Sequence, residues 1–301
     1  MIIQTPAKVN LRLKIEGRRD DGYHYLSMLN IFCDLCDELE IEIKDEPGIT
    51  LDVEGAPSLN EPKKNFAYIA AEKFLTRFEI GKGLSIKLRK QIPVGSGLGG
   101  GSGNAAYVLK TLVRLFGKDL LMQKKCSEKE LYAEVLKIGG EIGSDVYFFF
   151  SEGAAIIKGI GEKVYDIRAP FLENMTFALI LPQESVDTKL VYQDLREQKI
   201  EIQIDEELDA FVPITAGLDY SKLLELVEND LQPITGARAP LVAEVLDRMQ
   251  KLPEYVTAMS GSGSAIFALK REDPDLNDSD MQIIQTQLQG LPLKTRKTTF
   301  F

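Results

Sequence analysis

The feature that most constrains this chain is a glycine-dense stretch, Pro93-Val94-Gly95-Ser96-Gly97-Leu98-Gly99-Gly100-Gly101-Ser102-Gly103-Asn104-Ala105-Ala106. It follows residues 84–89, which alternate like a half-buried strand, and it precedes apolar residues at helical spacing from Ala105 to Leu115. Glycine permits positive φ and close approach to a ligand, and the first turn of a helix offers unpaired N–H groups to anions. A strand, a glycine turn and a helix start therefore predict a phosphate-binding loop, with a flexible linker as the alternative.

Two common phosphate loops fit this stretch poorly. Gly95–Gly100 satisfies the G-x-G-x-x-G dinucleotide pattern, but the preceding strand carries Lys87, Arg89 and Lys90. The central strand of a dinucleotide-binding fold is buried on both faces and would be apolar there. The Walker pattern also fails, because Gly101-Ser102 stands where Gly-Lys-Ser/Thr is required. A dinucleotide-dependent oxidoreductase is therefore the weaker interpretation.

Composition limits the partners that this chain can have. Its 301 residues suffice for two modest domains or one large one, and 44% apolar residues can build a full core. A net charge of −10 disfavours nucleic acid and anionic membranes as partners, but not a phosphorylated small molecule. The odd count of three cysteines is typical of a reducing compartment, and the first residues lack the pattern of a signal peptide. We therefore expect a cytoplasmic protein that binds neither nucleic acid nor membrane.

Strand-like and helix-like segments are mixed along the chain, which predicts an α+β fold. Period-2 alternation predicts strands at 9–15, 39–43, 49–53, 84–89, 154–158, 163–167, 176–181, 256–259, 265–269 and 293–299. Helical spacing predicts helices at 65–78, after the glycine stretch, and at 127–138, 219–231, 241–251 and 281–288.

Several of these elements have specific end signals. We expect 49–53 to form a hairpin with 39–43. Asn65 is a good N-cap for a helix that buries Phe66. Ser127 begins a capping box, and Gly139-Gly140 is expected to end that helix after Ile138.

The glycine stretch resembles the ATP-binding loop of the GHMP small-molecule kinases. Three further stretches resemble the family's motifs in the family's order: Pro6–Leu11 with Arg18–His24, then Gly143–Phe149, then Met259–Ser264. The resemblance implies a GHMP kinase fold. Its N-terminal domain, of the ribosomal-S5-domain-2-like type, would span 1–155 and bind ATP; its ferredoxin-like C-terminal domain would span 156–301 and bind the substrate.

The resemblance also implies an activity. The family members are ATP-dependent phosphotransferases with an alcohol acceptor, and they use ATP with Mg²⁺. The N-terminal stretches resemble the branch that phosphorylates a cytidine diphosphate alcohol in the non-mevalonate route to isoprenoid precursors. Another GHMP kinase, of the mevalonate, phosphomevalonate or homoserine type, or a non-catalytic nucleotide-binding protein, stays open. So does the choice between a monomer and a homodimer.

The resemblance assigns the chemistry to individual residues. Residues 93–103 would hold the polyphosphate, Lys8 would stabilise the transferred phosphoryl group, and Asp145 would act as general base. Asn10 would bind the polyol or phosphate part of the acceptor, and strand periodicity places it on the same face as Lys8. Judged without the resemblance, such a lysine is more often solvated, and such a carboxylate is more often a cap or a turn residue.

The acceptor's base would meet aromatic residues. By resemblance, Tyr23 would stack on cytosine, His24 would bond its polar edge, and Tyr192 would complete a sandwich; a place in a helix core with Leu195 is the alternative for Tyr192. Ser102 would contact a phosphate or Mg²⁺, or act as a plain N-cap.

The chain also departs from the family pattern. Gly103 and Asn104 replace a serine and an aspartate, and Tyr147 replaces a proline. The first two changes put any metal or polar role at residues 103 and 104 in doubt, and the third leaves the backbone after Asp145 less constrained.

Overall fold

The computed structural model describes residues 2–123, 127–168, 170–197 and 218–301. Its contacts divide the chain into two compact units. The first unit comprises Met1–Ala7, Leu35–Val94 and Gly99–Phe150, and the second comprises Lys8–Asp34, Gly95–Leu98 and Ser151–Phe301. The units are not consecutive stretches, because two long strands and the glycine loop each contribute to both. The division into domains at residue 155 stays a prediction.

The sheet of the first unit is built from the start of β1, the C-terminal part of β2 and two shorter strands. The strands are β1 (Ile2–Arg18), β2 (His24–Lys44), β3 (Ile49–Glu54) and β4 (Gly83–Arg89). β4 pairs antiparallel with β2, and β3 pairs parallel with β4. The hairpin expected between 39–43 and 49–53 is therefore wrong. Helix α1 (Phe66–Arg77) lies between β3 and β4 in the chain, and such a crossover makes the two strands parallel.

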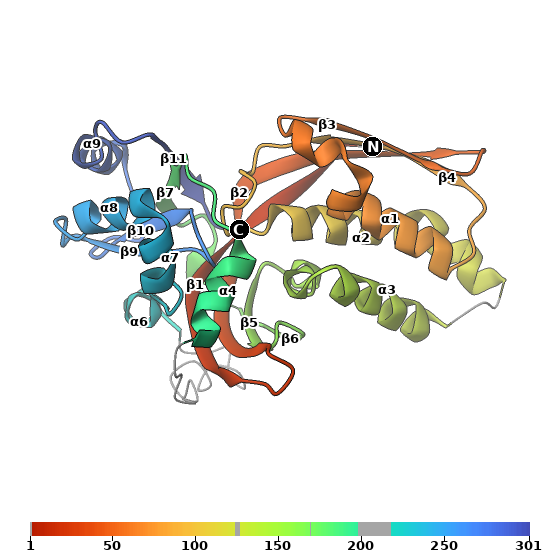
Figure 1. The fold of residues 1–301 in the computed structure, drawn as a ribbon, viewed down its shortest axis with the longest axis horizontal. Helices are drawn as coiled ribbons and strands as arrows, with labels where there is room; N and C mark the ends of the chain where they lie inside the picture. The colour runs from red at the N-terminus through yellow and green to blue at the C-terminus, as the bar shows by residue number, and fades with distance from the viewer. Residues whose placement is uncertain (1, 124–126, 169, 198–217) are drawn as a thin grey trace. The chain divides into compact units, whose positions relative to one another are not determined.

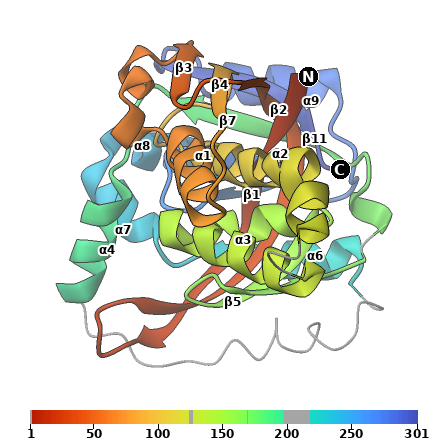
Figure 2. The same ribbon diagram turned by 90° about the vertical axis from the view of Figure 1, so that its right-hand side faces the viewer.

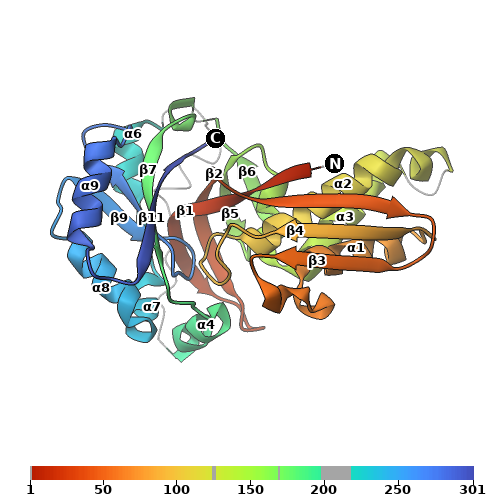
Figure 3. The same ribbon diagram turned by 90° about the horizontal axis from the view of Figure 1, so that it is seen from above.

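Three helices cover this sheet: α1, α2 (Gly100–Met122) and α3 (Glu128–Ile142). They pack against one another, with the strands β2, β4 and β3 lying over them (Figures 2 and 3). The Asn65 cap is confirmed, since its side chain accepts from the N–H groups of Ala67 and Tyr68. Phe66, however, is 37% exposed, because the buried face of α1 is formed by small residues such as Ala67 and by Phe74.

Helix α3 begins at the expected capping box of Ser127 and Glu130 but does not end at Gly139-Gly140. A Cβ atom at Gly139 would lie 2.9 Å from Cγ1 of Val146, and one at Gly140 would collide with the hydroxyl group of Tyr147. Glycine at these two positions therefore lets the next turn of the chain pack closely against the helix. Helix propensity alone could not distinguish this use from a stop signal.

The second unit contains a four-stranded antiparallel sheet of order β11-β7-β10-β9. Its elements are β7 (Thr176–Pro182), α8 (Pro240–Met249), β9 (Tyr255–Met259), β10 (Ile266–Lys270), α9 (Asp278–Gln287) and β11 (Leu293–Thr299). In the order of their appearance in the chain the strands lie 4-1-3-2, with α8 and α9 along one face (Figure 3). This is the ferredoxin-like arrangement, so the expected α+β fold is confirmed.

The remainder of the second unit includes the part of β1 from Lys8 onward and the part of β2 up to Asp34. Its elements are β5 (Ala154–Gly159), β6 (Lys163–Asp166), α4 (Thr188–Glu197), α6 (Tyr220–Leu226), β8 (Glu228–Asn229) and α7 (Gln232–Arg238) (Figure 1). The helix expected over 219–231 ends at Leu226. The residues that follow form β8, which pairs with Arg12 and Leu13 of β1. β5 pairs antiparallel with β2, and β6 pairs with β5. The sequence pattern did not predict α7.

Short 3-10 helices complete the fold at Pro57–Asn60, Pro62–Lys64, Ser144–Val146, Phe148–Phe150 and Pro170–Leu172. In the part of the chain that the structure describes, no helix combines the length and apolar character needed to cross a membrane.

Candidate functional site

The glycine loop has the backbone that an anion site requires. Gly95, Gly97 and Gly99 have φ values of 69°, 76° and 69°. A Cβ atom at Gly97 would collide with the carbonyl oxygen of Ser260, so two independent constraints select glycine there. α2 begins at Gly100, and within the described chain no side chain caps it and no acidic residue lies in its first turn. The first N–H groups of α2 therefore point out of the helix toward any bound anion.

In the second unit, a second glycine turn holds residues 95–98 in place. The N–H of Ala265 donates to the carbonyl oxygen of Ser96 at 2.9 Å, and Ser260 Oγ donates to that of Gly97 at 3.3 Å. The N–H of Lys8 donates to the carbonyl oxygen of Leu98 at 2.9 Å. The motif at 259–264 thus supports the loop, a contact that its sequence alone did not reveal.

Lys8 and Asn10 lie on one face of β1 and contact each other, as strand periodicity predicted. The Lys8 ammonium donates to Oδ1 of Asn10, and the two residues are only 3% and 1% exposed. The N–H of Asn10 donates to Ser260 Oγ at 3.1 Å, and Asn10 Nδ2 donates to Oδ1 of Asn30 at 2.6 Å. Lys8 is therefore a buried cation and not the solvated lysine of the alternative interpretation.

In the first unit, Ser102 lies beside the turn that carries Asp145. A Cβ atom at Gly143 would lie 3.9 Å from Ser102 Oγ, and the 3-10 helix Ser144–Val146 starts at the next residue. Asp145 is partly buried within this turn. A Cβ atom at Gly103 would lie 3.0 Å from the ring of Phe149, so glycine at this position leaves space for packing.

A buried polar network holds the chain where it enters the glycine loop. Asn104 Nδ2 donates to Thr5 Oγ1 at 2.7 Å and to Asp37 Oδ2 at 3.0 Å, and Lys90 Nζ donates to Asn104 Oδ1 at 3.2 Å. Asp37 is fully buried and forms an ion pair with Lys90. Its Oδ1 also accepts from the two N–H groups that follow Lys90, at 2.7 and 2.9 Å.

Burial lowers the pKa of Lys90, and the nearby Asp37 carboxylate opposes that shift. Asn104, a departure from the family pattern, thus has hydrogen-bond partners for both the oxygen and the nitrogen of its amide. Sequence reasoning missed Asp37, and it used Lys90 only to judge the preceding strand.

The aromatic residues predicted to bind a base lie in the second unit. The rings of His24 and Tyr192 are 5.7 Å apart between centroids and tilted by 36°. Tyr192 is half-buried on α4, next to the buried Val191, while Tyr23 is 59% exposed. Tyr192 therefore borders the helix core and also reaches His24.

His24 is 4% exposed, and its Nε2 has no hydrogen-bond partner among the described residues. Burial lowers the pKa of His24, with smaller contributions from Arg196 and Arg18, so its imidazole is neutral at pH 7. A neutral imidazole can donate or accept at Nε2 according to its tautomer.

Comparison with known proteins places the chain among kinases. Residues 65–153 match the model of the GHMP kinases N terminal domain, and residues 214–279 match that of the GHMP kinases C terminal domain. A 4-diphosphocytidyl-2-C-methyl-D-erythritol kinase of Geobacter sp. (strain M21) is 36% identical over 287 residues, or 94% of each chain. One of Bacillus mycoides (strain KBAB4) is 33% identical over 96% of this chain and 93% of its own.

Solved structures show the same fold. A crystal structure of 4-(cytidine 5'-diphospho)-2C-methyl-D-erythritol kinase has a TM-score of 0.71 at 28% identity and covers 100% of this chain and 99% of its own. A homoserine kinase from Cytophaga hutchinsonii also has a TM-score of 0.71, at 18% identity, over 99% of this chain and 94% of its own. The second likeness shows the fold alone.

Proposed function

Because this chain belongs to the GHMP kinase family, whose members are ATP-dependent phosphotransferases, we propose that it phosphorylates the 2-hydroxyl of 4-diphosphocytidyl-2-C-methyl-D-erythritol. This reaction belongs to the non-mevalonate route to isoprenoid precursors. The observation that carries the proposal is the similarity to kinases of this name over nearly the whole length of both chains. The geometry of the glycine loop supports the choice of ATP as phosphoryl donor.

The polyphosphate of ATP would bind at the glycine loop. Three glycines with positive φ turn the backbone beside the uncapped start of α2, where N–H groups and the helix dipole favour negative charge. We assign residues 93–103 to this role. Mg²⁺ would be held chiefly by the phosphates of ATP, with the Ser102 hydroxyl as a candidate ligand, and it would neutralise their charge.

Lys8 and Asp145 would share the chemical step. The acceptor hydroxyl oxygen attacks the γ-phosphorus, its proton passes to the Asp145 carboxylate, and the bond to the ADP oxygen breaks. The Lys8 ammonium would stabilise charge on the transferred group. Asn10 orients Lys8 through its Oδ1, which supports a role for both residues at the acceptor.

The cytidine part of the acceptor would bind where His24 and Tyr192 meet. Nε2 of His24 is buried and has no partner within the described residues, so a polar edge of cytosine can supply one. The exposed ring of Tyr23 is available to stack on the base. We also expect the protein to be cytoplasmic and to be a monomer or a homodimer.

One assay tests the function. Purified protein is incubated with Mg·ATP and each of four alcohols: the proposed acceptor, mevalonate, phosphomevalonate and homoserine. Release of ADP with the proposed acceptor alone is expected. Turnover with one of the other three and not with the proposed acceptor would instead assign the chain to a sister kinase.

Asp145→Asn separates a kinase from a non-catalytic nucleotide-binding protein. Loss of a general base should slow turnover by about 10²- to 10⁴-fold while the Kd for ATP is retained. The readouts are ADP release and calorimetric titration with ATP. An Asp145→Asn protein with the wild-type rate would remove this carboxylate from the mechanism.

A further inference from the structure

A directed chain of hydrogen bonds runs from Lys8 across two strands. A lysine ammonium can only donate, so its contact with Asn10 fixes the oxygen of the Asn10 amide on the side of Lys8. The Nδ2 of Asn10 must then face the other way, and it donates to Asn30 Oδ1 at 2.6 Å. The oxygen of Asn30 is thereby fixed toward Asn10, and its Nδ2 becomes the end of the chain.

This end of the chain is buried and open. Asn30 is 1% exposed, and its Nδ2 has no hydrogen-bond partner among the residues that the structure describes. Because Lys8 sets the direction of both amides, Asn30 cannot satisfy Nδ2 by rotating its amide without breaking the bond from Asn10. A buried donor that is fixed in this way costs free energy until an acceptor atom arrives.

The position of Asn30 relates it to the acceptor and not to ATP. Side chains at positions 24, 26, 28 and 30 of β2 share a face, and Asn10 contacts both Met28 and Asn30 on that face. His24, six residues earlier on the same strand, also has a buried nitrogen, Nε2, without a hydrogen-bond partner among the described residues. At about 3.3 Å per residue the two positions are roughly 20 Å apart, so only an extended ligand reaches both.

We propose that Asn30 determines specificity for the phosphoryl acceptor, by donating a hydrogen bond from Nδ2 to an oxygen of the bound alcohol while its Oδ1 holds the Asn10 amide. The proposal rests on the proposed function, because the chemistry of the ligand is that of an oxygen-rich cytidine diphosphate alcohol. In this arrangement the acceptor completes a chain that begins at the Lys8 ammonium. An alcohol without an oxygen at this point would leave the donor unpaired and would bind less well.

Two substitutions at residue 30 and one matched control test this role. Asn30→Leu removes both functions of the amide. Asn30→Asp keeps an oxygen for Asn10 but places a second oxygen where the donor was. Ser27→Ala is the control. Ser27 is also fully buried on β2, and its Oγ lacks a partner in the described part of the chain, but it faces the opposite side of the strand.

The measurements are the KM for the alcohol at saturating ATP, the KM for ATP, and Tm. We expect both Asn30 variants to raise the KM for the alcohol by about tenfold or more, the effect of one lost hydrogen bond, with the KM for ATP unchanged. Ser27→Ala should match wild type in both. An equal rise in both KM values would overturn the proposal, as would an Asn30→Asp protein with the wild-type KM, since the residue would then act only on Asn10.

The outcomes separate this proposal from the proposed function. Wild-type protein that does not turn over the cytidine diphosphate alcohol contradicts the function itself. Wild-type turnover combined with an unchanged KM for the alcohol in both variants contradicts only the role of Asn30. If Asn30→Leu is not recovered as folded protein, Asn30→Asp and Ser27→Ala decide the question alone.

Discussion

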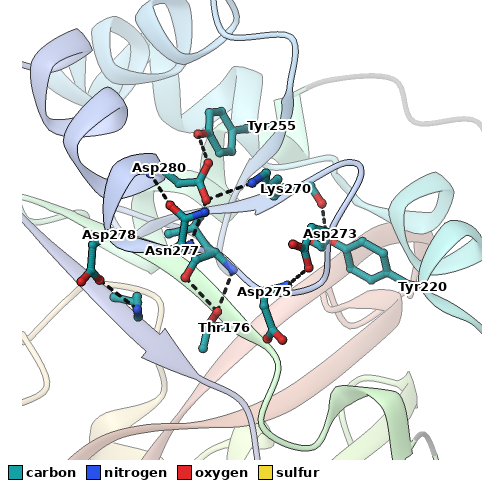
Figure 4. A network of polar contacts seen from close by, with 11 residues as sticks. Thr176, Tyr220, Tyr255, Lys270, Asp273, Asp275, Asn277, Asp278 and Asp280 are labelled. Atoms are coloured by element: carbon teal, nitrogen blue, oxygen red, sulfur yellow. Dashed lines mark hydrogen bonds and ion pairs between the residues drawn. The ribbon is translucent and has the colours of Figure 1, made fainter.

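Two buried polar clusters of the second unit differ in how completely their hydrogen-bonding groups are satisfied. The first surrounds Asp280, which is 5% exposed at the start of α9. Its carboxylate accepts from the N–H of Asn277 at 2.8 Å, from the hydroxyl of Tyr255 at 2.9 Å and from Lys270 Nζ at 3.1 Å (Figure 4). The Asp280 cluster thus joins a helix cap to two neighbouring strands.

The second cluster is the chain of Lys8, Asn10 and Asn30 on β1 and β2. It is at least as deeply buried, but it ends in the open Nδ2 of Asn30, and the Nε2 of His24 on the same strand is also unpartnered within the described residues.

The contrast teaches how to tell a structural polar group from one that binds a ligand. Buried polar groups that serve the fold are satisfied by the fold, because each unpaired group costs about 1–3 kcal/mol. Unpartnered groups on the strand face that Asn10 contacts, unlike the Ser27 hydroxyl on the opposite face, indicate that the missing partner comes from outside the chain. Substitutions around Asp280 should therefore cost stability, and substitutions in the Lys8 chain should cost activity.

The largest expected effect is on the chemical step. Lys8→Met should lower the single-turnover rate by about 10²- to 10³-fold, because a buried cation at the transferred phosphoryl group is lost. Lys14→Met is the control, since Lys14 lies on the same face of β1 but pairs with Glu228. A Lys8→Met enzyme with the wild-type single-turnover rate would place Lys8 among the structural groups.

A smaller effect should fall on stability. Asp280→Ala leaves the Tyr255 hydroxyl and the Asn277 N–H without their acceptor, and should lower the free energy of unfolding by about 2–3 kcal/mol. The turnover of the remaining folded protein should be unchanged. Denaturant unfolding and ADP release measure the two quantities.

Asp278→Ala serves as the control for Asp280. Its carboxylate is 93% exposed and pairs with Lys297 at the surface, so its removal should change the free energy of unfolding by no more than about 1 kcal/mol. Equal losses for the two variants would contradict the distinction between the buried and the exposed carboxylate.

His24→Phe tests the second open group. The substitution keeps an aromatic ring but removes Nε2, which no described residue pairs with, so the free energy of unfolding should stay the same or rise. The KM for the acceptor should increase by about tenfold, the effect of one hydrogen bond, with the KM for ATP unchanged. A loss of stability without any change in the acceptor KM would show that His24 belongs to the core and not to the ligand site.

The smallest effect concerns pH. Burial alone would raise the pKa of Asp280, but the hydrogen bonds from the Asn277 N–H, Tyr255 and Lys270 together bring that pKa below its usual value of 3.8. A carboxyl group with a lowered folded-state pKa contributes stability above its unfolded pKa, and this contribution is lost as the pH falls through the folded value.

The stability difference between wild type and Asp280→Ala should therefore be largest near neutral pH. It should begin to shrink below a pH of about 4 and decrease further as the carboxyl group is protonated in the folded protein. Denaturant unfolding of both proteins at several pH values measures it. A difference that grows as the pH falls would have the wrong sign for a lowered pKa.

The sequence alone predicted two helix caps correctly, because their signal is local. Asn65 and Ser127 cap their helices as expected, because a cap depends on a side chain and N–H groups two or three residues away. The expectation for Gly139-Gly140 was wrong, because the deciding contacts come from Val146 and Tyr147 in the next turn. The roles of the candidate site residues stay predictions for the experiments above.

By itself, the sequence determined the glycine loop between a strand and a helix, the position of Lys8 and Asn10 on one strand face, and the family to which the motifs belong. These features follow from backbone rules that act over a few residues. Only the tertiary structure decided which groups satisfy one another: Ser260 reaches Asn10 across 250 residues of chain, and Asn30 lies beside Asn10 at a separation of 20. Burial makes such long-range pairing obligatory, and no local pattern specifies the partner.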